Sequence, residues 1–119
     1  MVEKFKTILQ QITDAKGEMT LFAMMKMDEF TDKWSVVVCA PWARTENRSE
    51  NFTFIKGVLD ANLNEEERIT IARIGIFPKQ DQAIQALLQF QEGTTIKEDT
   101  KINGFMVHEA HILHSNSNL

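Results

Sequence analysis

Hydrophobic residues recur at helical spacing in three segments of the chain. The clearest segment spans about residues 2–16 and has apolar residues at i, i+3, i+4 and i+7: Phe5, Ile8, Leu9 and Ile12. Gly17 follows this stripe at the position of a left-handed helix cap. The spacing therefore predicts an amphipathic helix that ends at about residue 16.

Two later segments have the same spacing. Asn47 and Glu50 stand three residues apart, as in a capping box that opens a helix. Asp81 is placed to cap a further helix, and Gly93 to end it. The apolar stripes are Phe52, Ile55, Val58, Leu59 and Leu63 in the first of these helices, and Ile84, Leu87 and Leu88 in the second.

Four other segments predict strands. Residues 34–40 are rich in β-branched residues and residues 68–77 carry four isoleucines, and a proline follows each segment. Residues 102–114 predict a long last strand. Residues 19–27 consist largely of good helix formers. We nevertheless predict a strand there, because a glycine separates them from the first helix and a short turn leads to the next strand.

The isoleucines of the third predicted strand change phase between Ile71 and Ile74. Two explanations remain open. The strand has a β-bulge near Ala72 and Arg73, or it is buried on both faces.

The predicted order, α-β-β-α-β-α-β, indicates one α+β domain over residues 1–114, followed by a frayed polar tail at 115–119. We expect a two-layer sandwich in which three helices cover one face of a four-stranded, mostly antiparallel sheet. The helix between the second and third strands allows one parallel, right-handed crossover.

Three of the four predicted strands are apolar on both sides over part of their length. A sheet with one solvated face alternates apolar and polar residues instead. With all helices on one face, we expect a second copy of the chain to cover the other, as a homodimer. The alternative is that the helices divide between the two faces.

Composition narrows the class of protein. The chain has 119 residues, 43% of them hydrophobic. Its net charge is −4 and it has no stripe of lysine and arginine, which argues against nucleic-acid binding.

No apolar run approaches the roughly 20 residues of a membrane span. A single cysteine excludes an intrachain disulfide, and the first residues lead into an amphipathic segment instead of a secretory signal. We therefore expect a cytoplasmic protein.

The three histidines are the first candidates for chemistry. His108, His111 and His114 are spaced three residues apart, but on a strand His108 and His111 point to opposite faces, and His108 and His114 lie about 20 Å apart. The spacing also differs from the zincin motif, which needs two histidines four residues apart on a helix. We predict no metal site and no cofactor.

Cys39 ends an apolar strand, which is typical of a small buried hydrophobe and not of a nucleophile. No phosphate-binding or nucleophile motif occurs, so we assign no catalytic residue. The methionines at 19, 24, 25 and 27 are expected to fill the core.

The loop at 41–48 is the best candidate binding site. It joins the end of a strand to the start of a helix, where open sheets often bind ligands and helix N-termini favour anions. We predict that Trp42 stacks on a ligand and that Arg44 and Arg48 bind its negative charge. The alternative is structural: Trp42 closes the core, and the arginines pair with Glu46 and Glu50.

Together these features predict a non-catalytic, self-associating intracellular domain that binds a partner protein or a small, anionic ligand. The alternative is a small enzyme with an active site at a subunit interface, built from Cys39, Arg44 or a histidine.

Overall fold

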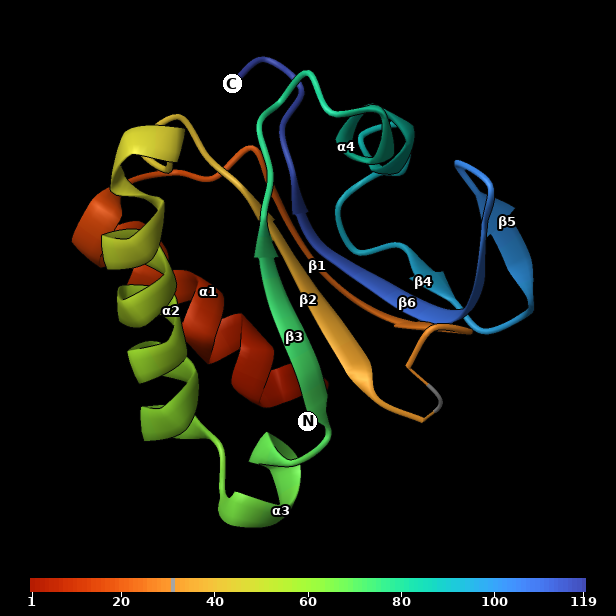
Figure 1. Cartoon of the computed structure of the whole chain (residues 1–119), viewed down its shortest axis with the longest axis horizontal. Helices are drawn as coiled ribbons and strands as arrows, with labels where there is room; N and C mark the ends of the chain where they lie inside the picture. Colours follow the sequence, from red (N-terminus) through yellow and green to blue (C-terminus); the bar gives the residue numbers. More distant parts are fainter. Residues whose placement is uncertain (31) are drawn as a thin grey trace.

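Six strands form one mixed sheet with helices on both faces in residues 1–30 and 32–119, which the computed structural model describes (Figure 1). The elements are α1 (Val2–Lys16), β1 (Leu21–Met27), β2 (Trp34–Cys39), the 3₁₀ turn η1 (Thr45–Asn47), α2 (Arg48–Asn62), α3 (Glu65–Arg68), β3 (Ile71–Ile76), α4 (Gln82–Leu87), β4 (Thr95–Ile96), β5 (Thr100–Ile102) and β6 (Phe105–Ser115). The strand order is β3-β2-β1-β6-β4, and β5 also pairs with β6. β2 and β3 are parallel, and the other pairs are antiparallel.

The prediction of four strands and three helices in two layers is wrong. Within the described residues, the sheet has six strands and the helices number four. The predicted strand at 102–114 is two strands joined by a hairpin at Asn103 and Gly104, whose φ angles are 49° and 84°. An Asn-Gly pair favours this kind of turn, because both residues tolerate positive φ. That signal was overlooked, and the two-residue strand β4 was not predicted.

The helix predicted from residue 47 begins as expected but without the predicted capping box. The Asn47 side chain accepts a hydrogen bond from the Arg44 N–H at 2.8 Å, so it serves the turn before the helix. A true capping box opens the unpredicted helix α3 instead, where the side chains of Asn64 and Glu67 each accept a hydrogen bond from the other residue's backbone N–H. Helix α1, the hairpin of β1 and β2, and the parallel crossover through α2 are confirmed.

The third strand has a β-bulge, the first of the two explanations left open for its change of phase. Trp34 lies opposite Ile71 and Ser35 opposite Arg73, so Ala72 is the extra residue of a bulge. This bulge explains the change of phase between Ile71 and Ile74.

Alternate side chains of the central strands enter two separate hydrophobic cores. Phe22 and Met24 of β1 join the core under α1 and α2, whereas Ala23 and Met25 join the core under α4 and β5. Figure 1 shows α1 and α2 on one side of the sheet and α4 on the other. Because one chain covers both faces, the reason for expecting a second copy over the sheet no longer holds. Self-association stays a prediction.

The methionines at 19, 24, 25 and 27 are all buried, as predicted. In the described residues, no helix has both the length and the apolar character needed to cross a lipid bilayer.

Candidate functional site

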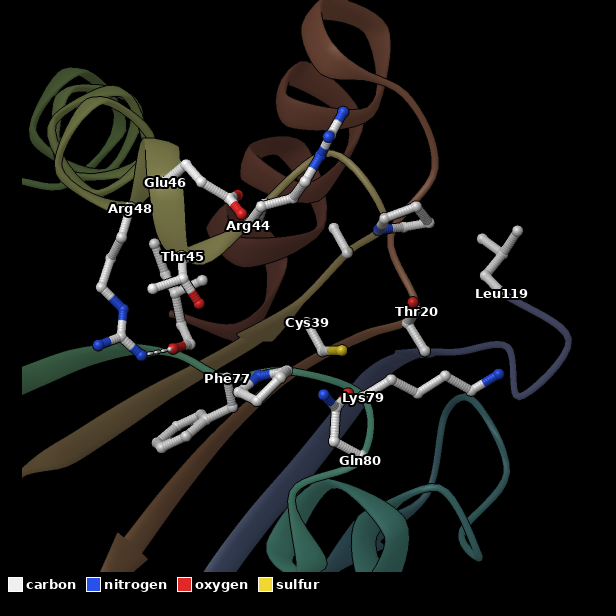
Figure 2. Close-up of a pocket in the computed structure, with 15 residues that line it drawn as sticks. Thr20, Cys39, Arg44, Thr45, Glu46, Arg48, Phe77, Lys79, Gln80 and Leu119 are labelled. Carbon is white, nitrogen blue, oxygen red and sulfur yellow. Dashed lines mark hydrogen bonds between the residues drawn. The ribbon is translucent and has the colours of Figure 1, made fainter.

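A cavity of about 330 Å³ opens where the parallel strands β2 and β3 end (Figure 2). Its walls come from the loop between β2 and α2, from the loop between β3 and α4, and from Thr20 and Leu119. The position of the cavity follows from the topology of the sheet. Parallel neighbours place their carboxyl ends at the same edge of the sheet, and ligands bind there in open α/β sheets.

The cavity is more basic than the chain as a whole. Among the described side chains that line it, those of Arg44, Arg48 and Lys79 are cationic and that of Glu46 is acidic, on a chain with a net charge of −4. η1 and α2 begin beside it, and the partial positive charge at a helix N-terminus adds to the same field. The lining therefore favours a negatively charged occupant.

Two of these cations donate to neutral carbonyl groups. The guanidinium of Arg48 donates to the Ile76 carbonyl at 2.7 Å, and the ammonium of Lys79 donates to the Ser117 carbonyl at 2.7 Å. These bonds orient the side chains without cancelling their charge. In the part of the chain that the structure describes, no ion pair joins Arg44 or Arg48 to Glu46 or Glu50. The alternative in which those carboxylates neutralise the arginines is therefore not what the structure contains.

Trp42 lies apart from the two arginines with which it was predicted to act. Its indole Nε1 donates to the Gly17 carbonyl at 3.1 Å, and its ring packs against the core under α1 and α2. Gly17 has a φ of 110°, and a Cβ at this position would lie 3.7 Å from the Trp42 ring. Trp42 is not one of the described residues that line the cavity. It anchors the loop that carries Arg44 and Arg48.

Two asparagines hold the same loop. The side-chain amides of Asn47 and Asn51 donate to the Trp42 carbonyl at 3.2 and 3.4 Å. Asn51 is buried in the first turn of α2, in line with the buried apolar residues Ile55 and Leu59. The sequence shows a polar residue at this position of the helix, but it does not show that the Trp42 carbonyl is the hydrogen-bond partner of this residue.

Cys39 lies at the floor of the cavity, where Figure 2 shows its sulfur beside Thr20. Burial raises the pKa of the Cys39 thiol, while the hydrogen bond with Thr20 opposes that shift. The thiol is therefore protonated at neutral pH, which is typical of a structural cysteine in the lining of the cavity and not of a nucleophile.

Lys79 and Thr20 line the cavity but were not predicted. Lys79 follows the end of β3, and the topology brings that loop beside the predicted loop at 41–48. The predicted parallel crossover was sufficient to identify this second loop, since parallel strands end together. Thr20 reaches the cavity through the pairing of β1 with β2, which carried no comparable signal.

The three histidines are held apart along β6 and meet different carboxylates. His108 bonds to Asp99 at 2.7 Å and also to Asp28, and these two hydrogen bonds, the one with Asp99 foremost, raise the pKa of His108. His111 donates to Glu109 at 2.8 Å. His114 lies 2.7 Å from Glu92 and 3.4 Å from Glu18. No group of three or more potential ligands has a metal-binding arrangement in residues 1–30 and 32–119.

Comparison with protein-family models, with curated proteins and with solved structures finds no significant match to this chain.

Proposed function

We propose that this domain binds a small organic anion, a carboxylate or a phosphate ester, in the cavity at the ends of β2 and β3. The observation that carries the proposal is the excess of cationic side chains in the lining of an acidic chain: Arg44, Arg48 and Lys79 against Glu46. The cavity's 330 Å³ lies at the lower end of the range for small-molecule sites, about 300–1,000 Å³.

Each cation has a distinct role in this proposal. Arg48 is held by the Ile76 carbonyl and supplies a fixed positive charge at the wall. Arg44 and Lys79 approach the cavity from different loops, so a ligand that contacts both joins the two loops. All of these residues belong to one chain, and the proposal does not need a second copy.

The proposal is for binding and not for catalysis. The thiol of Cys39 is the nearest group with nucleophilic potential, and burial keeps its pKa above the ordinary value. We also place the domain in the cytoplasm, because a single, unpaired cysteine fits a reducing compartment.

The test is an NMR titration of the backbone amides with inorganic phosphate and, separately, with citrate. We expect saturable shifts confined to residues 44–48 and 77–80. Charge-assisted hydrogen bonds contribute about 1.5–3 kcal/mol each, so the double variant Arg44→Gln with Lys79→Gln should weaken binding by at least about tenfold. Added sodium chloride should weaken it further through screening.

The matched control is Lys97→Gln with Lys101→Gln, which removes the same charge from the segment 95–102. This variant should bind as the unaltered chain does. Shifts spread evenly over the surface, or equal losses in both double variants, would show that the cavity is not a binding site.

A further inference from the structure

Residues 116–119 form a tight turn beside the cavity at the ends of β2 and β3. The Asn116 N–H continues the pairing of β6 with β1 by donating to the Thr20 carbonyl at 2.8 Å. The Asn116 side chain accepts a hydrogen bond from the Asn118 N–H at 3.0 Å, and the Leu119 N–H donates to the Asn116 carbonyl at 3.2 Å. These are the bonds of an Asx turn and a β-turn, and they reverse the chain after β6.

The 116–119 turn brings an apolar side chain and a backbone carbonyl to the cavity. Leu119 is one of the lining residues and is half-buried, whereas Ser117 and Asn118 are exposed. The Ser117 carbonyl accepts a hydrogen bond from the ammonium of Lys79 at 2.7 Å. Figure 2 shows the Lys79 side chain extended toward Leu119. One of the cationic side chains of the lining is thus held by the turn.

Further contacts tie the turn to the segment before β1. The Asn116 side-chain amide donates to the Glu18 carboxylate at 3.1 Å. Thr20, whose carbonyl binds the Asn116 N–H, itself lines the cavity. Since Glu18 and Thr20 precede β1 and Lys79 follows β3, the turn joins two sides of the cavity that are distant in the sequence.

An anion in the cavity competes with the turn for Lys79. A carboxylate or phosphate oxygen is a stronger acceptor for an ammonium than a neutral carbonyl, because it adds the attraction between two opposite charges. The Ser117 carbonyl belongs to an exposed residue, so water replaces its lost hydrogen bond at little cost. Leu119 opposes the exchange, because its release exposes apolar surface that is partly covered in the turn.

We propose that the 116–119 turn is a gate on the anion cavity. In the closed state it holds the ammonium of Lys79 on the Ser117 carbonyl and keeps Leu119 in the cavity wall, and a bound anion displaces it. This inference rests on the proposed function, since it concerns the regulation of the same site. The apparent affinity for the anion then falls with the fraction of the chain that is open, so a loosened turn should strengthen binding.

The first test loosens the turn. Asn116→Ala with Leu119→Ala removes the side-chain acceptor of the Asx turn and the apolar side chain at the cavity, and it changes no charge. In NMR titrations with inorganic phosphate and, separately, with citrate, this variant should bind at least about threefold more tightly than the unaltered chain. Equal or weaker binding by the loosened variant would overturn the gate.

The matched control is Ser117→Ala with Asn118→Ala. These two residues make their hydrogen bonds through the backbone carbonyl of Ser117 and the backbone N–H of Asn118. The control changes the same number of side chains in the same turn but keeps its bonds, so it should bind as the unaltered chain does. A gain in affinity as large as that of the loosened variant would show that the anchors of the turn play no part.

The second test uses the unaltered chain and does not depend on the folding of a variant. Anion binding without movement of the turn shifts only residues 44–48 and 77–80, whereas release of the turn adds residues 116–119. The heteronuclear NOE of residues 116–119 should then fall toward that of a flexible chain as the cavity saturates. An NOE that stays at the value of the strands in the saturated complex would overturn the gate.

The outcomes separate the gate from the proposed function. Saturable binding that is equal in the unaltered chain and in the loosened variant, with the turn still ordered, supports the anion site and overturns the gate. A lack of binding in both chains overturns the proposed function and the gate with it. Binding that is measurable only in the loosened variant supports both.

Discussion

The two faces of the sheet are covered by different kinds of structure. One face lies under α1 and α2, which have fifteen residues each. The other lies under α4, which has six residues, and beside the short strands β4 and β5. Both cores exclude solvent, because Phe22 in the first and Ile84 in the second are fully buried. The same sheet is thus closed by long helices on one side and by short segments on the other.

The elements that cover the two faces also differ in how they are held in place. Long helices satisfy most of their own backbone hydrogen bonds, and their apolar stripes dock as units. β4 and β5 obtain theirs by pairing with β6. Short segments that depend on a neighbour open at lower free energy than long, packed elements. We therefore expect the second face to open locally before the first.

The largest effect is expected at the centre of the first core. Phe22 is fully buried, and its ring centroid lies 6.1 Å from that of Phe5. Phe22→Ala should lower the free energy of unfolding by about 3–5 kcal/mol, because it leaves a cavity among large side chains. Urea denaturation followed by circular dichroism measures this change. Phe105→Ala is the control, since Phe105 is 46% exposed and its loss should change stability by about 0.5 kcal/mol or less.

A smaller and more local effect is expected on the second face. Leu87 of α4 is buried, and Leu87→Ala should cost about 2–5 kcal/mol, in the lower part of that range because a short helix relaxes around the change. Hydrogen exchange should accelerate in α4, β4 and β5 more than in α1. If α1 exchanged faster to the same extent, the two covers would open together and the contrast between the faces would be wrong.

The smallest effect concerns the charged contacts around β5. His108 bonds to Asp99, in the loop before β5, and to Asp28, in the turn after β1. These bonds raise the pKa of His108 in the folded chain. Its contribution to the free energy of unfolding is therefore fully present below its pKa in the unfolded chain, and it is lost as the pH rises through its pKa in the folded chain. Compared with His108→Gln, the unaltered chain should be more stable at about pH 5.5, and the difference should shrink by about pH 8.5. A difference that is constant over this range would show that the charge of His108 plays no part.

Some elements were predictable because their signal is local. The stripe from Phe5 to Ile12 and the glycine at 17 located α1. The change of phase between Ile71 and Ile74 left a bulge or burial of both faces open, and the pairing with β2 shows the bulge. Asn103 and Gly104 carried an equally local signal, which was overlooked in favour of one long strand. β4 could not be predicted in the same way, because two residues show no periodicity and pair only where β6 passes them.

The candidate cavity was predictable in part. Arg44 and Arg48 lie in its wall as part of a loop between a strand and a helix. The structure assigns Trp42 to the loop's anchor at Gly17, which depends on where α1 ends in space. Lys79 joins the cavity because β3 lies parallel to β2, a pairing between segments more than thirty residues apart.

By itself the sequence determined the long helices, the hairpin of β1 and β2, the extended course of β6 and the separation of its histidines, since each follows from the spacing of neighbouring residues. Only the tertiary structure decided how the helices divide between the faces and which loops meet at the cavity. These features depend on which distant segments pack together. An apolar stripe states that a surface must be buried, but it does not state against which partner.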